Sequence, residues 1–219
     1  MPLDPLTDPK RLVEAGYDRI AETYADWAAG STSDERMRYA DLLLRRLPPG
    51  APVLELGCGA GVPVTQALAR RFAVTAVDIS ARQVALAQRN APGATVLQAD
   101  MAGLTFPPAS FDGVIALYSI IHLPRDEHAP LLRAIATWLR PGGLLIATMG
   151  VNDTAAGTEE DWLGAPMFWS GFDSAANQRL VRDAGLRILS AREEATDEDG
   201  QPVLFLWIVA EKPLGAPDP

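Results

Sequence analysis

The sequence predicts an α/β fold in which helices cover both faces of a mostly parallel sheet. Three observations support this fold class. From residue 52 onward, apolar runs of four to seven residues recur along the chain, and helical patterns separate the early runs. A glycine-rich stretch at residues 57–61 directly follows the first run. The 219 residues and the 48% apolar content fit a single soluble globular domain. Strands that alternate with helices favour a doubly wound, Rossmann-like, three-layer sandwich.

Two helices are predicted before the first strand. The first extends from Pro9 to about Ala29, where apolar residues recur at helical spacing, namely Leu12, Tyr17, Ile20, Tyr24 and Trp27. The second extends from about Ser33 to Leu47, with Ser33 as its N-cap and the following Pro-Pro-Gly as its end.

The sheet follows these two helices. Strands are predicted at 52–56, 73–77, 94–98, 111–117, 143–149, 186–190 and 203–209. The helices between them are predicted at 63–71, 80–90, 126–139 and 173–184. Between the last two strands stands only a charged stretch that ends in Asp199-Gly200. Because an Asp-Gly pair favours a hairpin, we expect the last strand to be antiparallel to its neighbour.

Composition and charge exclude several classes of protein. The net charge of −9 disfavours nucleic-acid binding, whose affinity depends largely on phosphate neutralisation. No apolar stretch approaches the roughly 20 residues that span a bilayer, and no secretory signal is visible, so we expect a cytoplasmic protein. The single cysteine, Cys58, excludes an internal disulfide and a multi-thiolate metal site.

The glycine loop after the first strand predicts a ligand site. In an open parallel sheet, ligands bind beyond the carboxyl ends of the strands, and glycine lets the backbone approach them closely. A dinucleotide fingerprint requires G-x-G-x-x-G, but Gly61 falls one residue early and Val62 stands in the expected place. Pro63 also removes one amide donor that a pyrophosphate would use.

Three carboxylates stand beside this loop. Asp78 ends the second strand, where it can accept hydrogen bonds from a ribose diol, and Asp100 follows the third, where it can accept from an exocyclic adenine amine. The alternative for each is a helix cap or a turn. Glu55 lies within the first strand, and carboxylates are rarely buried unpaired. We expect it to accept hydrogen bonds from the glycine-loop amides or from a cofactor amino group.

Five motifs in order resemble the series of class I S-adenosylmethionine-dependent methyltransferases: VLELGCGAG, VDIS, LQADM, FDGVIALYSIIHL and LRPGGLLIATM. The resemblance extends from about Tyr17 to Val209, and the helix YDRIAETYADW is similar to the small-molecule branch related to ubiquinone-biosynthesis methyltransferases. It implies a seven-stranded sheet of order 3-2-1-4-5-7-6 with strand 7 antiparallel. It also implies an N-terminal helical lid (1–48) over an S-adenosylmethionine-binding core (49–213), within one domain overall. The proline-containing residues 214–219 are expected to form a disordered tail.

The same resemblance implies which residues hold S-adenosylmethionine. The glycine loop would meet the methionine part, Asp78 the ribose hydroxyls, and Asp100 with Met101 the adenine. Tyr17 and Tyr24 would belong to the lid, or else simply pack in the core. We assign the cofactor site to Tyr17, Tyr24, Glu55, Gly57, Cys58, Gly59, Gly61, Asp78, Ile79, Asp100, Met101 and Leu117.

Candidate catalytic residues follow the fourth strand. Because S-adenosylmethionine carries its own activation, the protein must mainly align the acceptor and exclude water. Tyr118 and His122 stand on the rim where an acceptor would bind, and His122 is the candidate general base. Its alternative role is to brace the turn before the next helix. His128, inside that helix, is expected to be exposed and without a role.

The segment 149–173 is long for a connection between a strand and a helix. It contains large apolar residues, namely Trp162, Met167, Phe168 and Trp169. These residues predict a lid or wall of the acceptor pocket that favours a planar or apolar substrate. The alternative is a local satellite core that holds the loop down.

The sequence thus predicts a methyltransferase that acts on a small molecule without a metal ion. A catechol-type metal site would need a carboxylate where Tyr118 and Ser119 stand. Competing hypotheses are a non-methylating or regulatory protein of the same fold, a protein or RNA methyltransferase, and a nicotinamide-dependent oxidoreductase. The acceptor and the atom methylated stay open, and a monomer or a homodimer is expected, with no nucleic acid or membrane partner.

Overall fold

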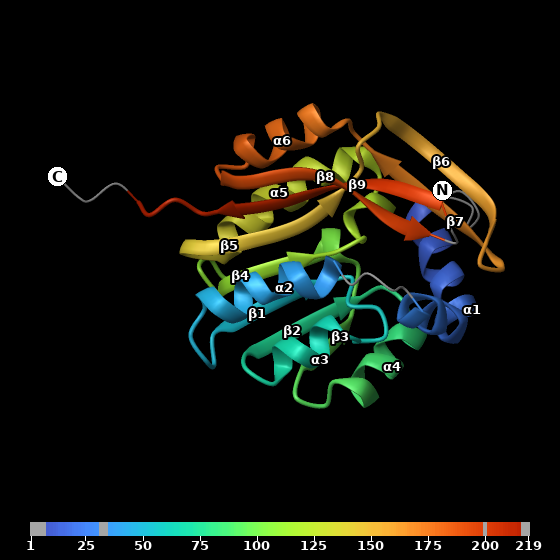
Figure 1. The fold of residues 1–219 in the computed structure, drawn as a ribbon, viewed down its shortest axis with the longest axis horizontal. Coiled ribbons are helices and arrows are strands. Elements are labelled where there is room, and N and C mark those ends of the chain that lie inside the picture. The colour runs from blue at the N-terminus through green and yellow to red at the C-terminus, as the bar shows by residue number, and fades with distance from the viewer. Residues whose placement is uncertain (1–7, 31–34, 199–200, 216–219) are drawn as a thin grey trace.

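The computed structural model describes residues 8–30, 35–198 and 201–215. A seven-stranded sheet crosses the molecule (Figure 1). In spatial order its strands are β3 (Thr95–Gln98), β2 (Ala73–Asp78), β1 (Pro52–Leu56), β4 (Phe111–Ala116), β5 (Leu139–Met149), β9 (Gln201–Glu211) and β8 (Arg187–Glu198). β9 is antiparallel to both of its neighbours, while the first five strands are parallel. The predicted order 3-2-1-4-5-7-6 is confirmed, because β8 and β9 are the sixth and seventh predicted strands.

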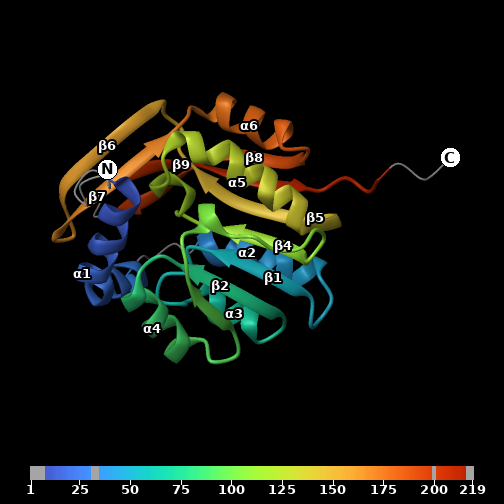
Figure 2. The same cartoon turned by 180° about the vertical axis from the view of Figure 1, so that it is seen from behind.

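Two helical layers cover the sheet (Figures 1 and 2). Successive side chains of a strand point to opposite faces, so the buried strands supply both layers. Val53 packs in the core beneath α2 (Glu35–Arg46), α3 (Val64–Ala69) and α4 (Ala81–Asn90). Leu54 packs in the opposite core, beneath α5 (Arg125–Trp138) and α6 (Ser174–Asp183). The three-layer sandwich predicted from the alternation of strands and helices is confirmed.

The long connection at 149–173, in which no strand was predicted, contains a β-hairpin. Strands β6 (Thr154–Trp162) and β7 (Ala165–Gly171) make a separate two-stranded sheet. β6 is exposed along nearly its whole length, so it carries no apolar alternation that would predict a strand. The hairpin packs against α1 (Pro9–Gly30), which lies across the carboxyl ends of the parallel strands (Figure 1).

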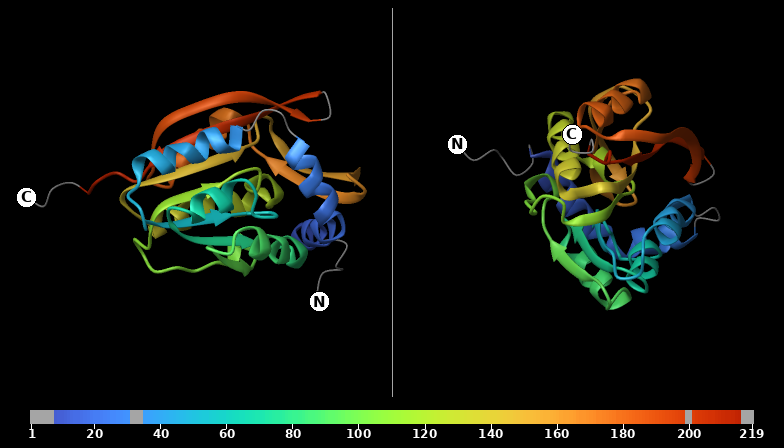
Figure 3. Two further views of the ribbon diagram at one scale, coloured as in Figure 1. Left: turned by 60° about the horizontal axis from the view of Figure 1, so that its bottom comes forward. Right: turned by 90° about the vertical axis from the view of Figure 1, so that its left-hand side faces the viewer.

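The last two strands are longer than predicted. β9 pairs with β5 only from Leu206 to Glu211, and its residues 201–205 pair with β8 alone. The charged stretch at 192–198, predicted as a connection, is therefore the outer half of β8. The left and right views of Figure 3 show this ribbon extending beyond the rest of the sheet. The predicted Asp199-Gly200 turn and the predicted Ser33 cap lie outside the described residues.

His128 was expected to be exposed, and that expectation is wrong. Its side chain is 1% exposed, and its Nε2 lies 3.1 Å from the carbonyl oxygen of Leu123. Its ring also contacts that of Phe172 edge-on, because this face of α5 turns inward. Among the helices that the structure describes, none combines the length and apolar character required to cross a bilayer.

Candidate active site

The glycine loop leaves β1 and turns sharply at the carboxyl end of the sheet. Gly57, Gly59 and Gly61 have φ angles of +74°, +53° and +78°, a region that favours glycine. A Cβ atom on Gly57 would lie 2.3 Å from the Cβ of Ser119, and one on Gly61 would lie 2.9 Å from the Cα of Ala87. The loop is thus wedged between the segment after β4 and helix α4, where only glycine fits.

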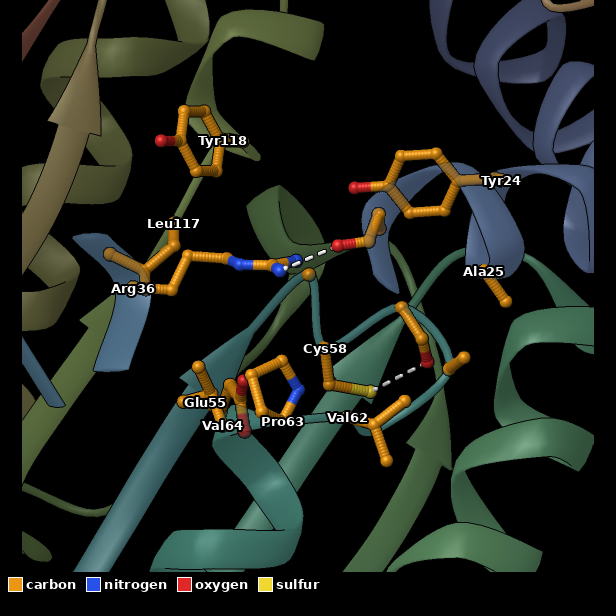
Figure 4. A pocket seen from close by; sticks show the side chains of 14 residues that line it. Tyr24, Ala25, Arg36, Glu55, Cys58, Val62, Pro63, Val64, Leu117 and Tyr118 are labelled. Carbon is orange, nitrogen blue, oxygen red and sulfur yellow. Dashed lines mark hydrogen bonds between the residues drawn. The ribbon is translucent and has the colours of Figure 1, made fainter. Parts of the chain in front are cut away.

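A cavity of about 240 Å³ lies over this loop. Glu55, Cys58 and Leu117 line it at the carboxyl end of the sheet, and Tyr24 of α1 and Arg36 of α2 complete its lining. In Figure 4 the side chains of Tyr24 and Arg36 point toward one another across the cavity. The Arg36 Nη2 atom also donates a hydrogen bond to the carbonyl oxygen of Ala28 at 3.0 Å.

Two smaller hollows continue the cavity along the strand ends. The first, about 60 Å³, shares Tyr24, Gly57, Gly59, Leu117 and Tyr118 with the large cavity. It is also lined by Tyr17, Asp78, Ile79, Met101, Ser119 and His122. The second, about 30 Å³, is lined by Lys10, Asp78, Ile79, Asp100, Met101 and His122, among others. Shared residues join the three hollows, so they follow the carboxyl ends of β1, β2, β3 and β4. Of the residues predicted for the cofactor, Gly61 does not line them but packs against α4.

Asp78 is buried beside the glycine loop. Its Oδ2 accepts a hydrogen bond from the Gly59 amide at 2.8 Å, and its Oδ1 accepts from the Ser80 amide at 3.0 Å. Burial raises the pKa of the carboxyl group to about 6, although these amide hydrogen bonds oppose the shift. The helix-cap role that competed for Asp78 belongs to Ser80, whose Oγ accepts from the Gln83 amide.

Asp100 has the capping role that was the alternative for it, and it also lines the cavity. Its Oδ1 accepts from the Ala102 amide at 2.9 Å and so caps the short helix η1 (Met101–Gly103). Its Oδ2 lies 2.6 Å from the Nζ of Lys10, which reaches over from α1. The carboxylate also lines the hollow at the end of β3. A capping contact therefore does not remove Asp100 from the cavity.

Glu55 lies 6% exposed in the floor of the large cavity. Burial raises the pKa of its carboxyl group to about 8. Its Oε2 has no hydrogen-bond partner among the described residues, so that oxygen does not accept from the glycine-loop amides. A buried acceptor without a partner costs free energy, and a donor placed in this cavity would satisfy it. Burial likewise raises the pKa of the neighbouring Cys58 thiol.

Tyr17 and His122 join α1 to the segment after β4. The Nε2 of His122 lies 2.9 Å from the Tyr17 hydroxyl, and its Nδ1 lies 2.9 Å from the carbonyl oxygen of Phe168. Because a carbonyl only accepts, Nδ1 carries the proton and Nε2 accepts from Tyr17. Burial lowers the pKa of His122 to about 4, so the ring is neutral at physiological pH.

Tyr118 adopts a left-handed conformation, with φ of +52°, at the rim of the cavity. Its amide donates a hydrogen bond to the Oγ1 of Thr148 on β5, which holds this conformation. Its hydroxyl lies 3.0 Å from the Oγ1 of Thr196 on the outer half of β8. The ring packs edge-on against Phe205 and Trp207 of β9.

The four residues predicted for the acceptor divide into two pairs. Met167 and Phe168 are buried in a small core against α1, as the satellite-core alternative proposed, and the partly buried Trp162 and Trp169 pack against the same core. The ring of Trp169 lies 4.4 Å from that of His122, and the ring of Trp162 lies 5.8 Å from that of Tyr17. None of the four lines the three hollows.

Several residues that line or support the site were not among the predicted ones, namely Lys10, Asp18, Arg36, Thr148 and Thr196. Asp18 accepts from the Ser80 hydroxyl at 2.6 Å and from the Arg82 amide at 3.0 Å. Lys10 could have been found, because it lies two helical turns before Tyr17, and Tyr24 lies two turns after it. The position of Thr196 depends on the outer ribbon, for which no local pattern was available. Within the described ranges, no group of three or more His, Cys, Asp or Glu side chains could hold a metal ion.

Comparisons with known proteins agree on one family. Residues 53–143 match the family model described as a methyltransferase domain. The chain is 33% identical over 204 residues to 27-O-demethylrifamycin SV methyltransferase of Amycolatopsis mediterranei, covering 81% of this chain and 74% of that protein. It is 33% identical over 168 residues to ubiquinone biosynthesis O-methyltransferase of Xylella fastidiosa, covering 66% and 67%.

A solved structure has a similar fold. It is 1,6-didemethyltoxoflavin-N1-methyltransferase of Burkholderia thailandensis, solved with 1,6-didemethyltoxoflavin and S-adenosylhomocysteine bound. The two chains superpose with a TM-score of 0.71 at 20% identity, covering 96% of this chain and 92% of the other.

Proposed function

We propose that this chain, which belongs to the S-adenosylmethionine-dependent methyltransferases, transfers the methyl group of that cofactor to a small organic acceptor without a metal ion. One observation carries the proposal: the three joined hollows extend from Glu55 past Asp78 to Asp100 and are covered by α1. Bound S-adenosylmethionine supplies an activated methyl group on a sulfonium. The chain must therefore bind the cofactor and the acceptor, orient them toward one another, and exclude water.

The donor set of the hollows fits this cofactor from end to end. The unpartnered Oε2 of Glu55 suits the amino group of the methionine part. Asp78 suits the ribose diol, since each of its oxygens keeps a lone pair beyond the amide that it already binds. Asp100 suits the exocyclic amine of adenine, with Met101 and Ile79 lining the same hollow. We assign Tyr24 to the cover over Gly59, where its ring lies 3.7 Å from the position of a Cβ.

We assign the acceptor to the side of the middle hollow that Tyr17, Tyr118 and His122 border, next to the cofactor. Trp162 and Trp169 stand behind Tyr17 and His122 and would form an aromatic wall, whereas Met167 and Phe168 hold the hairpin against α1. Such a wall favours a planar or apolar molecule. The names of the two relatives above point to oxygen acceptors, so phenols and hydroxyquinones are the first class to test.

An oxygen acceptor must lose a proton, and Tyr17 with His122 is the pair placed to manage it. The acceptor proton would pass to the Tyr17 oxygen while Tyr17 passes its own proton to Nε2 of His122, leaving an imidazolium. Because the pKa of His122 lies near 4, the ring is a weak base, and its first role is to position Tyr17. Tyr118 is held by Thr148 and Thr196 at the opposite rim and would orient the acceptor.

A metal ion is not part of the proposal. Tyr118 and Ser119 stand after β4, where a catechol-type metal site would place a carboxylate, and Ser119 Oγ already donates to the carbonyl of Leu56 at 2.8 Å. Methyl transfer from a sulfonium needs alignment rather than a Lewis acid when the acceptor is deprotonated by the protein.

Calorimetric titration with S-adenosylhomocysteine and with NAD tests the cofactor. We expect binding of the first alone, and Asp78→Ala should abolish most of that affinity. Methyl-labelled S-adenosylmethionine, incubated with a panel of phenols and hydroxyquinones and with excess EDTA, then tests the transfer. Binding of NAD instead would overturn the assignment of this pocket to S-adenosylmethionine. Tight S-adenosylhomocysteine binding without transfer to any panel member would favour a non-methylating protein of the same fold.

A further inference from the structure

Lys10 is unusual among the basic residues of this chain. Of its 19 basic residues, 17 are arginines, and the two lysines are Lys10 and Lys212. The start of α1 fixes Lys10 in place. The Asp8 side chain accepts from the Lys10 amide at 3.0 Å, and Pro9 occupies the first helical position, which suits proline. The Lys10 side chain therefore leaves a well-defined helix end directly above the carboxyl end of β3.

The Lys10 ammonium group bridges two carboxylates from different elements. Its Nζ lies 2.6 Å from Oδ2 of Asp100, and 2.9 Å and 3.0 Å from the two oxygens of Glu127 on α5. All three side chains are less than one third exposed. Lys10 also lines the hollow that Asp78, Asp100 and Met101 share. The cation thus belongs to the wall of the cavity as well as to the contact between α1 and the core.

We propose that Lys10 is a positioning residue for the nucleobase of the cofactor, acting through Asp100. The inference rests on the proposed function, which places adenine at Asp100. With Oδ1 held by the Ala102 amide and Oδ2 held by Lys10, the plane of the carboxylate is fixed, and each oxygen keeps a lone pair for an incoming amine. Without the ammonium group, the Ala102 amide alone would hold the carboxylate, and Oδ2 would bind water instead.

Charge gives Lys10 a second effect on the same step. Three carboxylates lie at this end of the site, those of Asp78, Asp100 and Glu127. Lys10 is the basic residue that lines the hollow beside them. An uncharged nucleobase that covers Asp100 removes water from that carboxylate, and a neighbouring ammonium group compensates the loss. A compact ammonium group fits beside this small hollow more easily than a planar guanidinium does.

Binding of two probes to the full chain tests the inference. S-adenosylhomocysteine carries the whole frame of the cofactor, and 5′-methylthioadenosine carries the nucleoside without the amino acid. We expect Lys10→Met to weaken both probes about tenfold, because a charge-assisted contact is lost. We expect Lys10→Arg to recover only part of the affinity. Lys212→Met is the matched control: Lys212 Nζ donates to the carbonyl of Leu139, away from the three hollows, and both affinities should stay unchanged.

A double-mutant cycle separates positioning from simple attachment of α1. If Lys10 acts through Asp100, Lys10→Met should cost less than about twofold in an Asp100→Asn background, and Glu127→Gln alone should keep most of the affinity. An equal loss in both backgrounds would show that Lys10 only attaches α1 to Glu127 and would overturn the inference. Unchanged affinity of Lys10→Met would overturn it too. If the unaltered chain binds neither probe, the proposed function fails first, and the inference fails with it.

Discussion

Gly57 is the residue at which the site is least tolerant of any side chain. Alanine there would adopt φ of +74° and would also place its Cβ 2.3 Å from the Cβ of Ser119, whose hydroxyl is already committed to Leu56. We expect Gly57→Ala to lower the free energy of unfolding by about 3 kcal/mol, as the sum of backbone strain and overpacking. We also expect it to abolish S-adenosylhomocysteine binding. Urea denaturation and calorimetry measure the two effects.

Gly50 is the control for that substitution. Its φ angle is +79°, but a Cβ there would meet no atom within 4 Å. Gly50→Ala should therefore cost only the backbone strain, about 1 kcal/mol, and should leave S-adenosylhomocysteine affinity unchanged. Equal losses of stability in the two variants would contradict the close approach of the glycine loop to Ser119.

The buried imidazole of His122 predicts a pH-dependent contribution to stability. Its pKa is about 4 in the folded state, against an ordinary value of 6.5. Between these values the unfolded chain binds a proton that the folded chain does not, so this contribution to the free energy of unfolding falls as pH falls. The destabilisation caused by His122→Asn should therefore be about 2 kcal/mol smaller at about pH 5 than at about pH 7.5. Urea denaturation at the two pH values measures it.

Comparison with a second variant is necessary because other buried groups titrate in the opposite sense. The pKa of Asp78 is raised to about 6 and that of Glu55 to about 8, so their contributions fall as pH rises through their titration. Tyr17→Phe removes the hydrogen bond to His122 and leaves all three groups in place, so its cost should change with pH much less than that of His122→Asn. A cost of His122→Asn that is equally flat would contradict the depressed pKa.

At the scale of elements, the contact between α1 and β7 depends on Gly16. A Cβ on Gly16 would lie 2.8 Å from the carbonyl oxygen of Pro166 and 3.0 Å from Cε of Met167. In an exposed helix, Gly→Ala stabilises by about 1 kcal/mol. Here we expect the opposite sign, with lower stability and weaker S-adenosylhomocysteine binding, because α1 must move off the hairpin. Ala15→Gly, at the exposed neighbouring position, loosens the helix without touching β7 and should leave the affinity nearly unchanged. A more stable Gly16→Ala would contradict the packing.

The central strands β1, β4 and β5 could be predicted because most of their side chains are buried on both faces of the sheet. Val53 and Leu54 pack in the cores on opposite faces of the sheet. Their strand is therefore a continuous apolar run in the sequence, whichever strands pair with it. β6 could not be predicted, because its exposed residues form a strand only through pairing with β7. The outer half of β8 could not be predicted for the same reason, because its charged residues form a strand only through pairing with the part of β9 that extends beyond β5.

The candidate site was predictable in part for a related reason. Asp78 and Asp100 stand at the ends of neighbouring strands, and parallel strands bring their carboxyl ends to one edge. Lys10, Asp18 and Thr196 reach that edge from distant parts of the chain, so only the packing of α1 and of the outer ribbon reveals them. The burial of His128 also depends on packing, because a histidine inside an amphipathic helix suits either face.

At the scale of the whole molecule, α1 contacts the loops that follow three strands of the sheet. Asp18 binds Ser80 and Arg82 after β2, Lys10 binds Asp100 after β3, and Tyr17 binds His122 after β4. The hollows lie between α1 and these loops, so a bound cofactor would touch both. Attachment of α1 and binding of the cofactor should therefore stabilise one another.

This coupling predicts that S-adenosylhomocysteine protects α1 as well as the glycine loop. At a ligand concentration 100-fold above the dissociation constant, the folded state should gain about 2.7 kcal/mol, and the melting temperature should rise accordingly. Amide hydrogen exchange in residues 9–30 should slow by about 100-fold, which corresponds to this gain in free energy, if α1 must separate from the core before the ligand leaves. NAD should produce neither effect. Protection confined to the glycine loop and to the loops after β2 and β3, with α1 exchanging as before, would contradict the role of α1 as a cover over the cofactor.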